Sequence, residues 1–242
     1  MKNIIITAGG TSEEIDNVRK ITNSSTGKLG MIIADEILNT HGNDIDNIYY
    51  ICSKNSLRPI HKKIKIIEIS NTFDLKEEVE KLLKKKNIDC FIHSMAVSDY
   101  TLDYVTNIEL LSQEINEHIN ENIESVIKNN KRIIKDKKIS SYSDNLIIVL
   151  KPTPKIIKLI KELSPNTFLV GFKLLDDVSE EELIKVSIAL RDKNKCDIVV
   201  ANDLENIRNG IHKAFIIDTD NNIIIANGKD DIAKKLVGKI YN

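Results

Sequence analysis

The chain lacks several features that common classes of protein require. Its 242 residues carry a formal net charge of −1, so no excess of either sign favours nucleic acid or an acidic membrane as a partner. No apolar run approaches the roughly 18 residues of a membrane span. The 3 cysteines are an odd number without C-x-x-C spacing, and no signal peptide is apparent. We therefore expect buried thiols and a cytoplasmic location.

Two familiar kinds of site are also missing from the sequence. The 5 histidines form no H-E-x-x-H or similar cluster, so we expect no histidine-based metal site and name no protein metal ligand. Gly27-Lys28 is followed by leucine, where the P-loop pattern requires serine or threonine. The compact G-x-G-x-x-G of dinucleotide enzymes is absent as well, because a long polar loop separates the glycines.

A phosphate-binding pattern is nevertheless present at residues 7–30. Apolar Ile4-Ile5-Ile6 leads into Gly9-Gly10, and the segment 24–30 then opens a helical pattern. A buried strand, a glycine turn and a loop at a helix start direct backbone N–H groups and the positive helix end toward an anion. The alternative is that these glycines only permit tight turns and close helix–strand packing.

The remaining sequence mostly alternates between strand and helix patterns. Strands are expected at 3–8, 45–53, 64–70, 88–97, 146–150, 167–174 and 196–203, and helices at 27–40, 73–86, 179–194 and 229–241. This alternation predicts an α/β fold with a Rossmann-like, doubly wound, mostly parallel sheet in one domain over 1–242. Ligands of such sheets bind at the carboxyl ends of strands, where 7–10 and 94–100 fall.

Two segments depart from this alternation. Residues 101–145 are polar and include the basic run 131–138, so we expect a lid or insertion there, the alternative being a solvated charge run. Residues from about 206 to 227 predict a β-hairpin that turns at 220–222. Polar clusters follow four strands, and they suit nucleotide binding and electrostatic stabilisation better than nucleophilic catalysis.

Several separated motifs resemble those of the phosphopantothenoylcysteine synthetases, also called phosphopantothenate–cysteine ligases. The motifs are ITAGGTSEEIDNVRKITNSSTGKLG, HSMAVSDY, KDKKISS, LKPTPKII, VGFKL and ANDL, and they span essentially the whole chain in family order. The resemblance implies a ligase that joins 4′-phosphopantothenate to cysteine through an acyl-nucleotide in coenzyme A biosynthesis. It implies CTP, or else ATP, as co-substrate with Mg²⁺, and a homodimer. It also implies a stand-alone synthetase, because the chain has no room for the flavin-dependent decarboxylase of the usual bacterial arrangement.

The resemblance assigns three catalytic positions. Asn23 matches an asparagine whose amide would donate to the acyl oxygen. Arg19 matches an arginine that would neutralise a phosphate or carboxylate. Lys135 aligns with the lysine required for acyl-nucleotide formation, with Lys137 and Lys138 as alternatives in the same run.

A larger set is assigned to the nucleotide and its phosphates. These residues are Gly9, Gly10, Ser24, Ser25, Thr26, Gly27, Lys28, Met95, Ala96, Asp99, Phe172, Asn202 and Lys229. An acceptor at Asp99 and a stacking ring at Phe172 would suit cytosine, while Met95 replaces a small alanine and would crowd the base pocket. Mg²⁺ would be held mainly by phosphate oxygens and water.

Two other functions stay open at this point. A NAD(P)-dependent Rossmann oxidoreductase would need an acidic ribose-binding residue after the second strand, which instead ends in Ser53-Lys54. A non-catalytic nucleotide-binding module would bind without turnover. For the homodimer, either the 206–227 hairpin or the 101–134 insertion would supply contacts.

Overall fold

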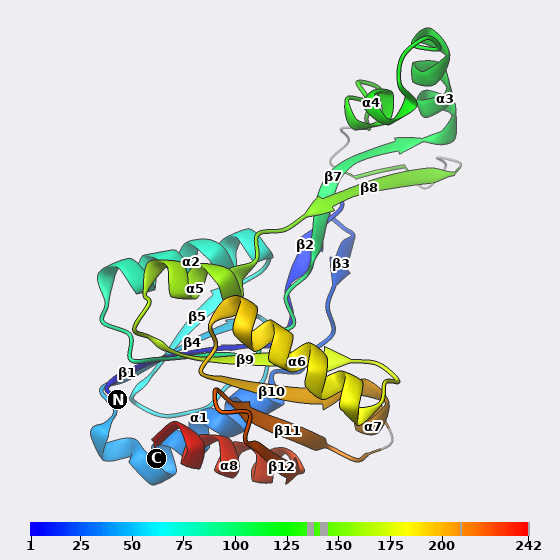
Figure 1. The fold of residues 1–242 in the computed structure, drawn as a ribbon. Coiled ribbons are helices and arrows are strands. Elements are labelled where there is room, and N and C mark those ends of the chain that lie inside the picture. The colour runs from blue at the N-terminus through cyan, green and yellow to red at the C-terminus, as the bar shows by residue number, and fades with distance from the viewer. Residues whose placement is uncertain (135–137, 141–144, 209, 242) are drawn as a thin grey trace.

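The computed structural model describes residues 1–134, 138–140, 145–208 and 210–241. Eight strands form its main sheet: β1 (Asn3–Ala8), β4 (Asn47–Ser53), β5 (Ile64–Ile69), β6 (Cys90–His93), β9 (Phe168–Leu175), β10 (Ile198–Asp203), β11 (Lys213–Asp218) and β12 (Ile223–Asn227). Their order is β12-β11-β10-β9-β6-β1-β4-β5 (Figure 1). β11 runs antiparallel to β10 and β12, and the other pairs are parallel. The predicted Rossmann-like, mostly parallel sheet is therefore confirmed.

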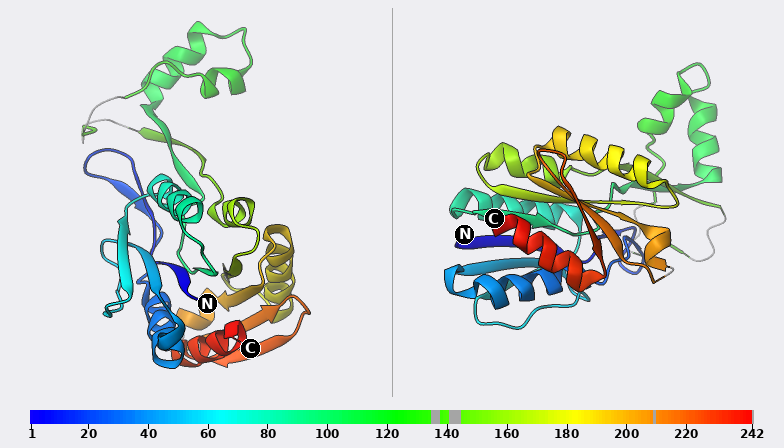
Figure 2. Two further views of the ribbon diagram at one scale, coloured as in Figure 1. Left: turned by 90° about the vertical axis from the view of Figure 1, so that its left-hand side faces the viewer. Right: turned by 60° about the horizontal axis from the view of Figure 1, so that its bottom comes forward.

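Helices cover both faces of this sheet. α1 (Lys28–His41) and α8 (Lys229–Tyr241) lie on one face, and α2 (Thr72–Lys85), α5 (Ile156–Leu163) and α6 (Glu180–Asn194) lie on the other (Figures 1 and 2). The period-2 alternation of a strand explains how one strand serves both layers. In β1, Ile4 and Ile6 pack with α1 and α8, whereas Ile5 packs with α2 and α5. A one-residue register slip would turn each set of side chains toward the helices on the opposite face.

Side-chain caps fix the starts of two helices. The Asn71 side chain accepts from the backbone of Asp74, and the Asp74 side chain accepts from the backbone of Asn71, which makes a capping box at the start of α2. At α6 the Ser179 hydroxyl accepts from the Glu182 N–H at 3.2 Å. α8 occupies the predicted 229–241.

An arm built from the segments 100–128 and 146–152 projects from the body of the protein (Figure 1). β7 (Tyr100–Asn107) pairs antiparallel with β8 (Leu146–Pro152), and α3 (Ile108–Glu117) and α4 (Ile123–Lys128) lie at its tip. A strand at 100–107 was not among the predicted elements, although the branched and aromatic side chains there favour one. The strand expected at 146–150 exists, but it pairs with β7 outside the main sheet.

Smaller elements complete the chain. β2 (Ser12–Glu14) and β3 (Lys20–Thr22) form a hairpin within the polar loop after β1, which the sequence did not predict. η1 (Gly42–Asp44) follows α1, and α7 (Leu204–Arg208) occupies the start of the segment expected to be hairpin. The hairpin itself is β11–β12. β6 is shorter than the expected 88–97, because the chain leaves the sheet after His93.

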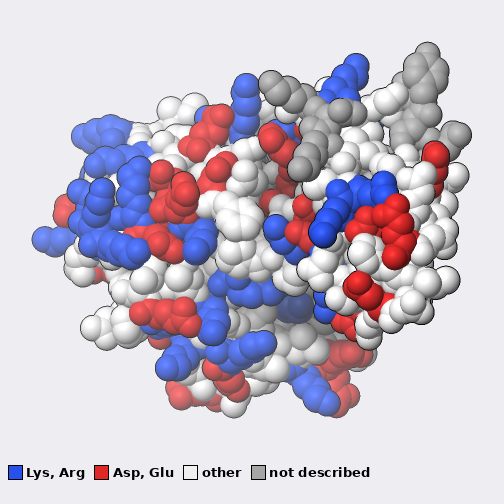
Figure 3. Space-filling model, turned by 90° about the horizontal axis from the view of Figure 1, so that it is seen from above, with Lys and Arg blue, Asp and Glu red and all other residues white. Residues whose placement is uncertain are grey.

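The surface seen from the arm side carries both signs of charge. Lys and Arg side chains are interspersed with Asp and Glu across this face rather than gathered in one area (Figure 3). Among the helices that the structure describes, none has the length and apolar character needed to cross a membrane.

Candidate active site

The loops after β1 and β6 meet at the carboxyl end of the sheet. β4 and β6 lie on opposite sides of β1, so the strand order reverses at the carboxyl end of β1. There the Ala96 N–H donates to Gly9 O at 2.8 Å, and the Thr11 N–H donates to Ala96 O at 3.1 Å. The two polar clusters that the sequence placed at strand ends are therefore joined backbone to backbone.

Glycine is required at two positions of this junction. A Cβ on Gly10 would lie 1.7 Å from the carbonyl oxygen of Asn23, far inside van der Waals contact. Gly9 has a φ of +86°, and a Cβ there would lie 1.8 Å from Ser56 Oγ. The packing role that the sequence left as an alternative is thus real, and phosphate binding by these glycines stays a prediction.

The Asn23 side chain lies between the two loops. Its backbone N–H donates to Thr11 O at 3.1 Å, and its Nδ2 donates to Val97 O at 3.2 Å. Its Oδ1 accepts from the Ser98 hydroxyl at 3.2 Å. An amide nitrogen carries two hydrogens, and within the described residues only one has an acceptor. Asn23 therefore keeps one N–H donor for a ligand.

An open cleft of about 990 Å³ lies beside Asn23. Its lining includes Gly10, Lys20, Asn23, Ser24, Ser25, Thr26, Ser53, Lys54, Glu68 and Asp74. The polar loop before α1 therefore faces a space of ligand size, as the phosphate prediction requires. Ser53, Lys54 and Glu68 were not predicted as site residues, although they lie at or near the ends of two predicted strands.

Lys28 and Lys229 lie far apart in the sequence, but the positive charge of each lowers the pKa of the His212 imidazole. Both begin helices, α1 and α8, at the edge where the parallel strands end. Burial lowers the pKa of His212, and the positive charges of Lys229 and Lys28 lower it further. The two lysines thus contribute to one region of positive potential near two helix N-termini, which attract anions.

Arg19 lies at the tip of the β2–β3 hairpin and not in the lining of the cleft. Its Nη1 pairs with Asp16 Oδ2 at 3.4 Å, and its Nη2 donates to Ile139 O at 3.4 Å. Asp16 also accepts from the backbone of Val18, Arg19 and Ile139, and these hydrogen bonds, that of Val18 foremost, lower its pKa despite burial. The hairpin tip therefore holds the chain that follows the basic run.

The basic run itself is only partly described. Lys135 and Lys137 lie outside the described residues, and Lys138 is exposed directly before Ile139. The run thus reaches the Arg19 hairpin at its far end. Whether one of its lysines meets Asn23 stays a prediction.

The residues assigned to the nucleotide base belong to different parts of the core and surface. Met95 is 8 % exposed and packs in the core on the α2 and α5 face, and its effect on a base pocket stays a prediction. Phe172 packs against the core on the opposite, α1 and α8 face. Asp99 is largely exposed and pairs with Lys155, while Asn202 is buried and donates to Lys213 O at 3.3 Å. Their role in base binding stays a prediction.

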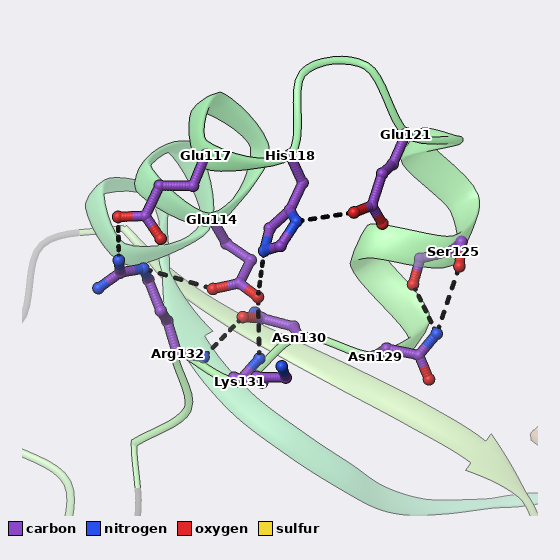
Figure 4. Close-up of polar contacts among 9 residues, drawn as sticks. All are labelled: Glu114, Glu117, His118, Glu121, Ser125, Asn129, Asn130, Lys131 and Arg132. Carbon is purple, nitrogen blue, oxygen red and sulfur yellow. Dashed lines mark hydrogen bonds and ion pairs between the residues drawn. The ribbon is translucent and has the colours of Figure 1, made fainter.

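A carboxylate–histidine cluster lies in the arm, far from this cleft in sequence. Glu114, Glu117 and His118 bring one ligand atom each within 4.8 Å of one another. Arg132 already pairs with Glu117 and with Glu114, whose Oε2 lies 3.3 Å from Arg132 Nε (Figure 4). A cation would have to displace this guanidinium, so the cluster works as an ion-pair network that ties α3 to the chain after α4.

Comparisons with a family model and with curated proteins point to one family for this chain. A family model described as the DNA/pantothenate metabolism flavoprotein C-terminal domain matches residues 1–126 and 126–242. The coenzyme A biosynthesis bifunctional protein CoaBC of Thermococcus kodakarensis is 34% identical over 235 residues, covering 97% of this chain and 47% of that protein. The chain thus spans about half the length of the curated relatives it matches.

Solved structures agree with the fold. The crystal structure of the DNA/pantothenate metabolism flavoprotein from Streptococcus pneumoniae matches with a TM-score of 0.83 and 38% identity, covering 100% of this chain and 98% of that one. A Cab2 mutant in complex with phosphopantothenate-cysteine matches with a TM-score of 0.69 over 99% of this chain and 85% of that one. At 17% identity the second likeness shows the fold alone.

Proposed function

Because this chain belongs to the DNA/pantothenate metabolism flavoprotein C-terminal domain family, we propose that it joins 4′-phosphopantothenate to cysteine. The observation that carries the proposal is the Asn23 amide, whose second N–H has no acceptor among the described residues, beside a cleft lined at the ends of β1, β4 and β5. The Thermococcus relative is named for coenzyme A biosynthesis, and the Cab2 complex holds phosphopantothenate-cysteine, the product of this reaction.

The chemistry proceeds in two steps. The phosphopantothenate carboxylate attacks the α-phosphorus of the nucleotide, and pyrophosphate leaves with the electrons of the broken P–O bond. The cysteine amine then attacks the acyl carbon, the nucleoside monophosphate departs, and the amine loses a proton. A free carboxylate is a poor acyl donor, and the mixed anhydride supplies the missing leaving group.

The residues divide between these steps. A lysine of the basic run, Lys135 first, would stabilise charge on the α-phosphate, and Arg19 would neutralise a substrate anion. Asn23 would donate to the acyl oxygen as it becomes negative in the second step. The loop before α1, with Lys28 and Lys229, would hold phosphates.

CTP is the nucleotide we assign, and ATP is the alternative. A carboxylate such as Asp99 can accept from an exocyclic amine, which both bases carry, so selectivity must be measured. Mg²⁺ bound to the triphosphate would neutralise part of its charge. The cleft supplies oxygens at Ser24, Ser25 and Thr26, while Glu68 already pairs with Arg58 at 2.7 Å, so phosphate oxygens would supply most of the ligands.

Pyrophosphate release tests this function directly. Protein mixed with CTP, Mg²⁺, 4′-phosphopantothenate and cysteine should release pyrophosphate and CMP, and no release with either CTP or ATP contradicts the proposal. Nucleotide binding without release would favour a non-catalytic module, and tight NAD(P) binding would favour an oxidoreductase.

Two variants of Asn23 separate the steps. Asn23→Ala removes the donor, and Asn23→Asp keeps the shape but replaces the N–H with an acceptor. Both should still release pyrophosphate and should accumulate acyl-nucleotide. Fast full turnover by Asn23→Asp would contradict a role for the Asn23 amide in the second step.

A homodimer and a cytoplasmic location belong to the same proposal. Light scattering coupled to size exclusion should give about twice the 27.4 kDa of one chain. A monomer at assay concentration with full activity would contradict the dimer.

A further inference from the structure

Ser98 is a buried hydroxyl whose described side-chain contact is with Asn23. The residue is 3 % exposed, and its Oγ donates to Asn23 Oδ1 at 3.2 Å. A buried hydroxyl must find a partner or lose free energy, so this contact constrains both residues. Ser98 lies within the HSMAVSDY motif and the strand-end cluster 94–100, but neither pattern assigns it a role.

The backbone of Ser98 is fixed from two directions. Its N–H donates to Thr11 Oγ1 at 2.9 Å, and its carbonyl accepts from the Thr153 hydroxyl. Thr11 is fully buried, and its Oγ1 lies 3.4 Å from Thr72 Oγ1 at the start of α2. Ser98 therefore offers its hydroxyl from a rigid position that three parts of the fold define.

Two contacts together set the orientation of the Asn23 amide. The Val97 carbonyl can only accept, so the atom facing it at 3.2 Å must be Nδ2. Ser98 holds the opposite end of the amide through Oδ1. With both ends held, the second N–H of Nδ2 keeps a fixed direction. With only one end held, the amide can turn about its terminal torsion, which is broad in asparagine.

We propose that Ser98 is a positioning residue that holds the Asn23 amide ready to donate its free N–H during the acyl-transfer step. This inference rests on the proposed function, since it names a residue that supports the same site. A hydrogen-bond donor that is already oriented stabilises developing negative charge better than a mobile donor does, because it needs no reorganisation during the reaction. Ser98 should thus affect the second step and not the first.

Single-turnover kinetics of Ser98→Ala test the proposal. The pyrophosphate burst should be unchanged, and conversion of acyl-nucleotide to product on addition of cysteine should slow about five- to tenfold, the effect of one hydrogen bond. Ser98→Thr, which keeps the hydroxyl, should restore the rate. The double variant with Asn23→Ala should be no slower than Asn23→Ala alone.

Ser94→Ala is the matched control. Ser94 belongs to the same segment and donates to Thr7 O at 2.6 Å without contacting Asn23. It should leave the ratio of the two steps unchanged. If Ser98→Ala slows both steps by the same factor, or if its effect adds to that of Asn23→Ala, Ser98 is structural only and the proposal fails.

A second measurement separates this proposal from the proposed function. The ¹⁵N–¹H signals of the Asn23 side chain should shift and broaden in Ser98→Ala but not in Ser94→Ala. If the wild type releases no pyrophosphate, the ligase function fails whatever these signals do. If the signals do not change in Ser98→Ala, the positioning role fails even in an active enzyme.

Discussion

At the scale of single residues, the site depends on a close approach between two backbone segments. Gly10 permits the Asn23 carbonyl to lie where a side chain would otherwise be. The Asn23 amide is then held by a carbonyl and a hydroxyl from the loop after β6. The charged residues that the sequence emphasised, Arg19 and Asp99, are instead paired with Asp16 and Lys155.

Gly10→Ala should therefore disrupt the site. The new Cβ would overlap the Asn23 carbonyl at 1.7 Å, so the loop must move, at a cost of about 1–3 kcal/mol in the free energy of unfolding. Turnover should fall with it. Gly238→Ala is the matched control, because apart from its chain neighbours and the nearby backbone of α8 no atom lies within 4 Å of its Cβ position, and it should raise stability by about 0.5–1 kcal/mol. Urea unfolding measures both, and an unchanged midpoint for Gly10→Ala would contradict the close contact.

His93 predicts how stability depends on pH. It is buried beside Thr7, whose Oγ1 lies 2.8 Å from Nδ1, and burial lowers its pKa from 6.5 to about 4. Between these values the unfolded chain binds a proton that the folded chain does not, so this group lowers stability as pH falls from 6.5 to 4. The difference corresponds to at most roughly 3 kcal/mol.

The measurement is urea unfolding of the wild type and His93→Gln across that range. The variant, which carries no proton to gain, should lose less stability on acidification than the wild type does. His61→Gln, at an exposed position, should follow the wild type. Parallel curves for the wild type and His93→Gln would show that His93 is not held neutral.

At the scale of elements, the site depends on how strand ends and helix starts converge. The N-termini of α1 and α8 bring Lys28 and Lys229 near His212. The β2–β3 hairpin carries Arg19 away from the cleft and brings it to Ile139. In each arrangement, residues that are far apart in the sequence lie close together in the fold.

An NMR titration of His212 tests the first arrangement. Its pKa should lie below 6.5 and should rise when Lys229 or Lys28 is replaced by glutamine, because a neighbouring positive charge disfavours the imidazolium. The exposed Lys62→Gln serves as the control and should leave it unchanged. If the pKa of His212 stays the same when either lysine is replaced, the two lysines do not share one region of positive potential.

Hydrogen exchange tests the second arrangement. Asp16→Ala removes the acceptor of three backbone N–H groups, those of Val18, Arg19 and Ile139, so all three should exchange faster. Asn17→Ala, an exposed change in the same hairpin, should have no such effect at Ile139. Unchanged protection at Ile139 would mean that the hairpin does not hold this segment.

At the scale of the whole molecule, the sequence predicts the body better than it predicts the arm. Buried strands such as 3–8 and 196–203 are continuous apolar runs, which local pattern identifies. The arm strand 100–107 mixes exposed and buried positions instead of forming one apolar run, and it pairs with residues 39 to 52 positions further along the chain. For the same reason Gly9 and Gly10 were found as a motif, whereas Ser98 becomes visible only through its contact with Asn23.

The most direct test of the acyl-nucleotide account is to trace the carboxylate oxygen. When 4′-phosphopantothenate labelled with ¹⁸O in its carboxylate reacts with CTP and cysteine, the bridging oxygen of the intermediate leaves with the nucleotide. Mass spectrometry of the products should therefore find one ¹⁸O in each CMP and none in pyrophosphate. Unlabelled CMP, or label in released phosphate, would contradict the account.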